Sequence, residues 1–202
     1  MFTEQKFNIP PLKGISAKNI EEHLKLYAGY VKHANLVFDP VRSREGTQRA
    51  SASNGVEDYA LAEMRRRFGF EFNGMRNHEV YFKSLEGGSK SFSPESPLVK
   101  MIAERFGSFE EWLAEFKAIA LARGIGWAML FYDPVSKQLL NAWVDEQHLG
   151  QLQNCALILG LDMWEHAFVA DYQPSGKKNY IEDFFTNLNW LTIENNFKQT
   201  QK

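Results

Sequence analysis

Cysteine is almost absent from this chain of 202 residues, which contains only Cys155. A single cysteine excludes an internal disulfide and any zinc site that is built from several thiolates. Cys155 lies in the apolar run QNCALILGL, where a small buried side chain is the expected role. Because a chain without disulfides is typical of a reducing compartment, we predict a cytoplasmic protein.

Long apolar runs and a large excess of one charge are missing as well. No run approaches the ~20 residues that a membrane-spanning helix needs. The start, MFTEQKFNIPPLKG, lacks the basic and apolar regions of a signal peptide. The 23 basic and 25 acidic side chains leave a net charge of −2. We therefore expect neither a membrane nor a nucleic acid as a partner.

Apolar side chains are plentiful: 44% of the residues are hydrophobic, with 16 Phe and 5 Trp, which is ample for a packed core. A first helix is predicted over residues 16–39, with Ser16 as its N-cap and apolar residues at helical spacing. A second helix is predicted over residues 57–85, and a break at its FGFEFNG segment is one option. The polar residues 40–56 between the helices are expected to form a loop or a weak turn.

Glycine, serine and proline dominate EGGSKSFSPESP, residues 86–97, and this composition marks a domain boundary. We predict an N-terminal α-hairpin domain over residues 1–90 and a C-terminal α/β domain over residues 91–202. The second domain should begin with two more helices, the latter opening on a capping box made by Ser108 and Glu111.

The pattern then changes to strands. The runs GWAMLFYD and LLNAWVD, joined by PVSKQ, predict a hairpin, and CALILGLDMW predicts a third strand. One helix over residues 179–197 should close the chain. The expected fold class is α+β, with an N-terminal helical hairpin followed by a helical lobe that carries a three-stranded antiparallel sheet.

Two ionisable groups stand out in GLDMWEHAFV, residues 160–169. Asp162 and His166 are four residues apart, which places them on one side of their segment. A buried carboxylate costs several kcal/mol unless it is paired or binds a metal, so an ion pair and a metal site are both open. His23 and His78, each on the buried side of a predicted helix, could complete a cluster. Imidazole nitrogen and carboxylate oxygen suit iron, manganese or zinc.

The segment Asp162-Met163-Trp164-Glu165-His166-Ala167 resembles the DxWEHAY signature of the iron/manganese superoxide dismutase family. Further matches follow in order along nearly the whole chain: ISAKNIEEH, FNGMRNHEVYF, GSFEEWLAEF, GIGWAML and NLNW. The resemblance implies an antioxidant oxidoreductase that converts superoxide to oxygen and hydrogen peroxide by redox cycling of one manganese or iron ion. It implies four protein ligands for that ion: His23, His78, Asp162 and His166.

The resemblance also implies residues around the ligands. Family members hold a metal-bound solvent molecule with a glutamine that comes either from the second helix or from the sheet. This chain has Gly74 at the helical place and Gln147 at the sheet place, a combination that slightly favours manganese. His148 is the alternative to Gln147, one residue along. Trp127 and Trp164 match the aromatic walls of the family's pocket.

Tyr30 aligns with the tyrosine that closes the family's substrate channel, and Tyr27 is the alternative occupant because the alignment needs a gap. The paired histidines that often follow the first ligand are replaced here by LKLY. Val169 likewise replaces a tyrosine that usually meets one of those histidines across the dimer interface. These departures imply a substrate channel lined by different side chains, a slower enzyme or another route for protons.

Glu165 implies an oligomer. In the family this glutamate crosses the interface and bonds the metal-bound histidine of the other subunit, which here gives a homodimer through Glu165 and His166. A tetramer is the alternative to the dimer. Lys177 or Lys178 would contribute positive charge at the rim for the superoxide anion.

Two other functional classes are open from the sequence. The first is a metal-binding descendant of the same fold with low activity, which the missing histidine pair would explain. The second is a non-haem iron oxygenase that uses two histidines and a carboxylate. The oxygenase would leave either His23 or His78 unused, and crowding by Trp127, Trp164 and Phe82 argues against it.

Overall fold

A computed structural model describes residues 1–38 and 55–201. The predicted α+β class is confirmed, while the expected loop or turn over residues 40–56 lies almost entirely outside the described residues. The elements in chain order are α1 Ala17–Phe38, α2 Val56–Leu85, α3 Pro97–Phe106, α4 Phe109–Ala120, β1 Gly126–Asp133, β2 Gln138–Asp145, β3 Ala156–Asp162, η2 Glu165–Ala167, η3 Pro174–Gly176, α5 Lys177–Asn187 and α6 Trp190–Gln199.

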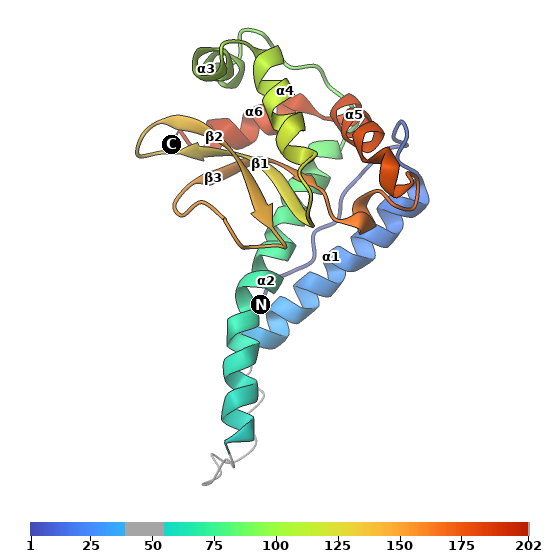
Figure 1. Ribbon diagram of the computed structural model, residues 1–202, viewed down its shortest axis with the longest axis vertical. Coiled ribbons are helices and arrows are strands. Elements are labelled where there is room, and N and C mark those ends of the chain that lie inside the picture. The colour runs from blue at the N-terminus through green and yellow to red at the C-terminus, as the bar shows by residue number, and fades with distance from the viewer. Residues whose placement is uncertain (39–54, 202) are drawn as a thin grey trace.

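The two long helices form the predicted hairpin, and α2 extends well beyond the rest of the molecule (Figure 1). The N-cap of α1 is confirmed, because the Ser16 hydroxyl accepts a hydrogen bond from Asn19 N at 3.1 Å. The option of a break near FGFEFNG is wrong, since α2 is continuous through Gly69 and Gly74. Each glycine costs a helix roughly 1 kcal/mol, a cost that packing of α2 on α1 and β3 offsets.

The sheet has β1 at its centre, in the order β2-β1-β3, and all pairings are antiparallel. The predicted hairpin is confirmed in the register Gly126↔Asp145 to Asp133↔Gln138. On the other side of β1, Trp127 lies opposite Asp162. The last residue of β3 therefore lies next to an indole at one end of the sheet, and β3 itself packs on α2.

The prediction of one closing helix is wrong, because α5 and α6 are separate. Between them the chain pairs with the last turn of α2 and with the connection that follows it: Asn189 N donates to Ser84 O at 2.7 Å, and Lys90 N donates to Leu188 O at 3.0 Å. Leu188 is extended, with ψ at 134°. The backbone groups that would continue a helix are thus used in long-range hydrogen bonds, which helical periodicity cannot reveal.

The Gly/Ser/Pro-rich connection does separate α2 from α3, and the division into domains at residue 90 stays a prediction. Ser108 caps α4 by accepting from Glu111 N at 3.0 Å, so this half of the predicted capping box is present. Within the described ranges, no helix combines the length and the apolar character that crossing a membrane requires.

Candidate metal centre

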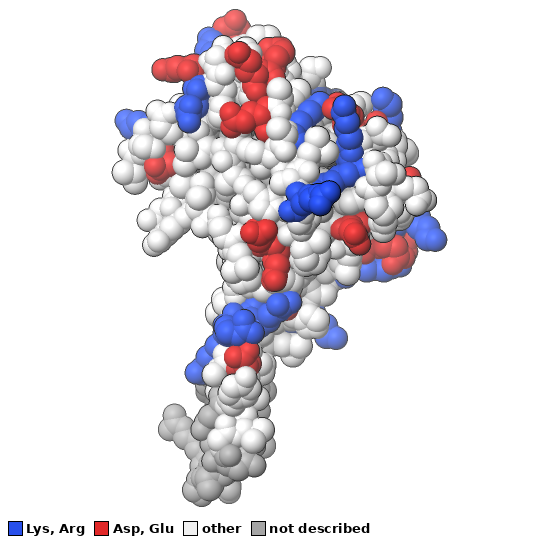
Figure 2. Space-filling model, viewed as in Figure 1, with Lys and Arg blue, Asp and Glu red and all other residues white. Residues whose placement is uncertain are grey.

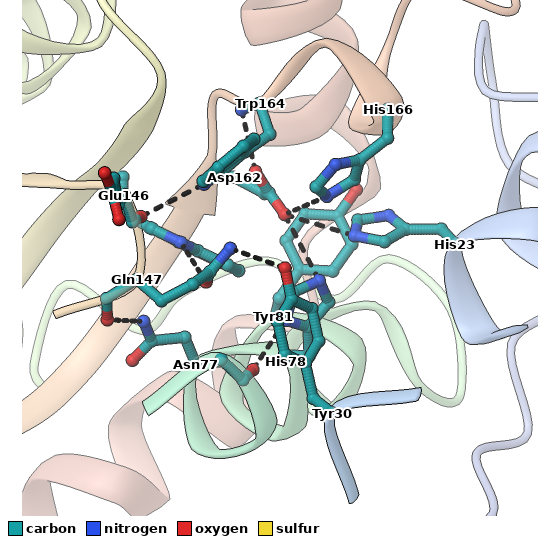
Figure 3. A network of polar contacts seen from close by, with 12 residues as sticks. His23, Tyr30, Asn77, His78, Tyr81, Glu146, Gln147, Asp162, Trp164 and His166 are labelled. Atoms are coloured by element: carbon teal, nitrogen blue, oxygen red, sulfur yellow. Dashed lines mark hydrogen bonds and ion pairs between the residues drawn. The ribbon is translucent and has the colours of Figure 1, made fainter. Parts of the chain in front are cut away.

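Four elements bring the four predicted ligands together at one buried point. His23 comes from α1, His78 from α2, Asp162 from the end of β3 and His166 from η2 (Figure 3). One ligand atom of each lies within 4.8 Å of all the others. The Nε2 atoms of His23, His166 and His78 lie 3.1, 3.2 and 3.5 Å from Asp162 Oδ2. Their role as ligands stays a prediction, but their convergence is a property of the fold.

The local chain path explains how Asp162 and His166 meet. Trp164 N donates to Asp162 Oδ1 at 2.8 Å, a turn in which a carboxylate accepts from the amide two residues on. This bond fixes one oxygen of Asp162 and leaves Oδ2 directed at the histidines. The short 3₁₀ turn η2 then returns His166 to the same carboxylate.

The donor atoms fit a bound cation. His78 Nδ1 lies 2.6 Å from Gly74 O, and because a carbonyl only accepts, the proton is on Nδ1 and Nε2 carries a lone pair. That Nε2 is buried and has no hydrogen-bond partner among the residues that the structure describes. A buried acceptor without a partner is costly, and a metal ion would satisfy it. Three imidazole nitrogens and one carboxylate oxygen are a suitable set for iron, manganese or zinc.

Burial and charge keep these groups in the protonation states that metal ligands need. Burial lowers the pKa of His23, against the opposing hydrogen bond of Asp162. Burial and then the charge of His23 lower the pKa of His78 to about 3. For Asp162, burial raises the pKa, but the charges and hydrogen bonds of His166 and His23 outweigh it and hold the pKa below the ordinary value. Both buried histidines are therefore neutral at pH 7 and Asp162 is ionised.

These shifts predict an acid-sensitive metal-free protein. Both histidines have a lower pKa when folded than the ordinary 6.5, so below that pH the unfolded chain binds more protons than the folded one. The free energy of unfolding should be largest above pH 6.5 and fall as the pH drops towards 3. Urea midpoints of metal-free protein at several pH values measure this. His78→Gln should flatten the dependence, and a midpoint that does not change with pH in the unsubstituted chain would contradict the assignment.

Gln147 lies beside the cluster and is fully buried. Its Oε1 accepts from Trp127 Nε1 at 2.9 Å, and its Nε2 donates to Tyr30 Oη at 3.0 Å. His148, the alternative at this place, instead packs its ring against Phe70 at 5.9 Å between centroids. Geometry thus puts the glutamine, and not the histidine, in the polar network around the ligands.

Tyr30 and not Tyr27 lies at the cluster. The Tyr30 ring is 5.0 Å from the His78 ring between centroids. The Tyr27 hydroxyl instead donates to Glu79 Oε1 at 3.2 Å, and Glu79 is not one of the predicted ligands. Gly74 makes this place for Tyr30: a Cβ at residue 74 would lie 2.5 Å from the phenol ring. A side chain at the helical glutamine position is therefore incompatible with Tyr30 as placed here.

The two predicted aromatic walls flank the cluster. Trp127 meets the His78 ring edge-on at 5.1 Å, and Trp164 stacks on the His166 ring at 5.7 Å. Trp164 is fixed by its Nε1, which donates to Glu146 O at 3.0 Å (Figure 3). Both indoles reduce the space for water next to the ligands.

Asn77 also belongs to this site, although it was not predicted from the sequence. Its side chain is 1% exposed, and its Nδ2 donates to Gln147 O at 2.9 Å. The same side chain accepts from Gln151 Nε2 at 3.1 Å. A buried amide directly before a predicted ligand on an aromatic-rich helix was the available signal, because such an amide needs hydrogen-bond partners.

The residues predicted to act at a subunit interface lie on the surface of this chain. Glu165 is exposed, the His166 side chain keeps 21% of its surface exposed, and Val169 is 44% exposed. Lys177 is half-buried, with its ammonium group donating to Ala122 O at 2.8 Å. Contacts of Glu165 and His166 with a second copy stay a prediction, and so does the role of Lys177 or Lys178 as positive charge at the rim.

Comparisons with known proteins point the same way as the geometry. The model of the family described as iron/manganese superoxide dismutases, C-terminal domain, matches residues 94–196. The chain is 31% identical to an iron superoxide dismutase of Aquifex pyrophilus over 202 residues, covering 98% of this chain and 92% of the relative. It is 43% identical to a manganese superoxide dismutase of Haloarcula marismortui over 115 residues, 56% of this chain and 54% of the relative. An iron superoxide dismutase of Pyrobaculum aerophilum is 27% identical over 208 residues, covering 96% and 93%.

Proposed function

Since this chain belongs to the iron/manganese superoxide dismutase family, we propose that it converts superoxide to oxygen and hydrogen peroxide with one manganese or iron ion per chain. When bound, that ion would supply reversible one-electron chemistry between its trivalent and divalent states. The observation that carries the proposal is the convergence of four ligand atoms within 4.8 Å, one of them a buried imidazole nitrogen without a hydrogen-bond partner in the described part of the chain.

The ligands have distinct tasks in this proposal. His23 and His78 bind as neutral imidazoles, and the low pKa that burial gives them keeps protons from competing down to acidic pH. Asp162 supplies the single negative charge, through Oδ2, while its Oδ1 is held by Trp164 N. His166 closes the set from the half-exposed side.

Gln147 and Tyr30 hold a proton beside the ligands. Trp127 Nε1 fixes Gln147 Oε1, which turns the amide Nε2 towards the Tyr30 hydroxyl. Burial chiefly raises the pKa of Tyr30, and the charges of Asp162 and Glu71 add to the rise, so the phenol keeps its proton at neutral pH. A protonated phenol on a fixed amide is suited to donate hydrogen bonds to an anion and to pass on protons that peroxide formation consumes.

The direct test is superoxide consumption by purified protein as a function of bound metal. We expect turnover to rise in proportion to manganese or iron content and to be absent from protein loaded with zinc, which binds the same donors but has no redox chemistry. The Gly74 and Gln147 pair slightly favours manganese as the active form. Fully loaded manganese and iron forms that both lack turnover would favour the low-activity descendant instead.

Gln147→Ala should separate metal binding from turnover. The change removes the amide between Trp127 and Tyr30 but no ligand, so metal content should stay near one ion per chain while turnover falls roughly 10- to 100-fold. Gln151→Ala is the matched control, because the Gln151 side chain donates its hydrogen bond to Asn77, one step farther out, and its loss should cost little turnover. Turnover equal to wild type in Gln147→Ala would assign the role to another group.

The two alternative functions, an oxygenase and a low-activity descendant, differ in how well they agree with the cluster and with the sequence. An oxygenase using two histidines needs either His23 or His78 outside the cluster, and both lie inside it. The low-activity descendant remains a second candidate, because LKLY and Val169 leave the family's histidine and tyrosine pair absent. We also propose a homodimer through Glu165 and His166, with a tetramer as the alternative, and the cytoplasm stays our predicted location.

A further inference from the structure

Glu79 is a carboxylate in the interior of the protein that the proposed function does not use. Figure 2 shows acidic and basic side chains at the surface on one face of the molecule, which is where charged groups are ordinarily found. Glu79 is instead only 5% exposed, and it directly follows the predicted ligand His78 on α2. It is not a member of the four-residue cluster. Because a buried carboxylate is costly unless it is paired and hydrogen-bonded, its partners should explain its place.

Both oxygens of Glu79 accept hydrogen bonds. Tyr27 Oη, on α1, donates to Glu79 Oε1 at 3.2 Å, and Arg76 Nη1, on α2, donates to Glu79 Oε2 at 2.6 Å. Burial raises the pKa of Tyr27 to about 12, against the hydrogen bond from Gln5 N, so the phenol is protonated at neutral pH and able to donate. Arg76 thus balances the charge of Glu79, while the bond from Tyr27 joins the two long helices.

This bond between the helices lies close to two predicted ligands. Tyr27 follows His23 by four residues, and Phe82 follows His78 by four residues, so each pair shares one face of its helix. The Phe82 ring lies 4.9 Å from the His23 ring, 6.1 Å from the His78 ring and 6.1 Å from the Tyr27 ring between centroids. A change in the distance between α1 and α2 at this level would therefore move Phe82 against the His23 ring.

The N-terminal arm, residues 1–9, closes the same group from a third side. Gln5 N donates to Tyr27 Oη at 2.9 Å. The Phe7 ring lies 5.7 Å from the Tyr27 ring and 5.4 Å from the Phe82 ring. Tyr27 and Phe82 are both fully buried. The Tyr27 hydroxyl therefore donates one hydrogen bond and accepts another, and its ring is packed between the arm and α2.

We propose that Tyr27 and Glu79 are positioning residues that fix the distance between α1 and α2, so that His23 and His78 are held at the spacing of one metal ion. The inference rests on the proposed function, since it concerns the ion that this function uses. The two imidazole rings lie 4.9 Å apart between centroids, and ligands held in place in advance bind a metal more tightly. Tyr27 is the last residue of LKLY, so the segment that replaces the family's histidine pair gains a role of its own.

Tyr27→Phe tests the proposal, because it removes only the hydroxyl that bonds Glu79. Zinc binding, measured by competition with a chelator, should weaken about tenfold, the lower end of what partners of metal ligands contribute. Zinc is a suitable probe because it binds the same donors without redox chemistry, so this readout does not depend on turnover. In manganese-loaded protein, the electron paramagnetic resonance spectrum of Mn²⁺ should also change shape, since it reports how the ligands are arranged around the ion.

Tyr172→Phe is the matched control. The Tyr172 hydroxyl also donates to a carboxylate, Asp183 Oδ2 at 2.8 Å, but this bond joins α5 to the segment before η3, and neither carries a predicted ligand. Both variants should lower the urea midpoint of the metal-free protein, whereas only Tyr27→Phe should weaken zinc binding and alter the Mn²⁺ spectrum. An equal loss of zinc affinity in the two variants would reduce the effect to general stability and overturn the proposal.

Asn35→Ala separates the bond between the helices from the contacts of the arm. The Asn35 side chain accepts from Phe2 N at 2.7 Å and donates to Phe2 O at 2.9 Å, so its loss loosens the arm on α1 without removing the Tyr27–Glu79 bond. Zinc affinity should stay near wild type. A loss as large as that of Tyr27→Phe would assign the effect to the arm and contradict the role of the helix link.

Glu79→Leu supplies the second half of a double-mutant cycle. It removes both carboxylate oxygens, and it leaves Arg76, whose side chain is 45% exposed, able to meet water. Glu79→Leu should weaken zinc binding, and adding Tyr27→Phe should cost little more, because two changes that break one bond are not additive. Wild-type zinc affinity and an unchanged Mn²⁺ spectrum in Tyr27→Phe, or full additivity in the cycle, would refute the proposal. Absence of turnover in manganese- and iron-loaded wild type would refute the proposed function instead, and zinc binding would still test the positioning role.

Discussion

His78→Ala is expected to yield a protein that takes up little metal and has at least about a hundredfold less dismutase activity. The change removes a predicted ligand nitrogen, His78 Nε2, that is buried without a hydrogen-bond partner in the described residues, and it leaves a cavity beside Asp162. Changes in the groups around a metal already cost 10- to 100-fold in affinity or activity, so losing a direct ligand should cost more. Metal content by mass spectrometry and superoxide consumption on the same sample measure both effects.

The matched control for this variant is His33→Ala. His33 lies on α1 with its side chain 55% exposed, and it is outside the four-residue cluster, so its loss should leave metal content and turnover near wild type. Because truncating a buried side chain also destabilises the fold by a few kcal/mol, circular dichroism should show that His78→Ala is folded at the assay temperature. A folded, fully metallated and active His78→Ala protein would refute the ligand assignment.

Glu165→Ala is expected to convert a dimer into monomers. We propose that Glu165 of each chain bonds His166 of the other, so one substitution removes two reciprocal contacts in a two-fold interface. Truncating one partner of a buried charged pair costs about 2–5 kcal/mol, which is at least a thirtyfold loss in dimer affinity. Light scattering at micromolar and lower concentrations should show the mass falling from twice the chain mass to the chain mass of 23.3 kDa.

Glu110→Ala serves as the control for the interface variant. Glu110 is also exposed, but it lies in the first turn of α4 and not in η2. Its removal should leave the oligomeric state unchanged. If Glu165→Ala keeps the wild-type mass down to nanomolar concentration, the proposed contact does not hold the dimer, and an exposed Glu165 on another kind of assembly is the remaining interpretation.

The sequence was sufficient for the elements whose signals are local. Periodicity predicted α1 and α2, turn residues predicted the β1–β2 hairpin, and buried ionisable residues pointed to His23, His78, Asp162 and His166. The break between α5 and α6 was not predictable in this way. Its cause is backbone pairing with Ser84 and Lys90, about one hundred residues earlier in the chain, and such pairing has no periodic signal.

Residues around the ligands were harder to assign because single-residue offsets matter there. Tyr27 and Tyr30 both lie on the helix that carries His23, and only the contacts with His78 and Gln147 separate them. Gln147 and His148 are adjacent in a loop, where side-chain direction follows from tertiary contacts such as that of Asn77. No spacing rule decides between neighbours in an irregular segment.

The contact between Gly74 and Tyr30 limits which side chains residue 74 can accept next to the cluster. The family resemblance implies that some members supply the glutamine of this site from the second helix. Moving it from residue 147 to that helical position would need a side chain at residue 74. Here a Cβ at residue 74 would lie 2.5 Å from the Tyr30 ring, so the substitution requires Tyr30 to move. Residue 147 would also have to change, because its glutamine now bonds the Tyr30 hydroxyl. No single substitution of this chain therefore exchanges one arrangement for the other, because Tyr30 has to move in the same event.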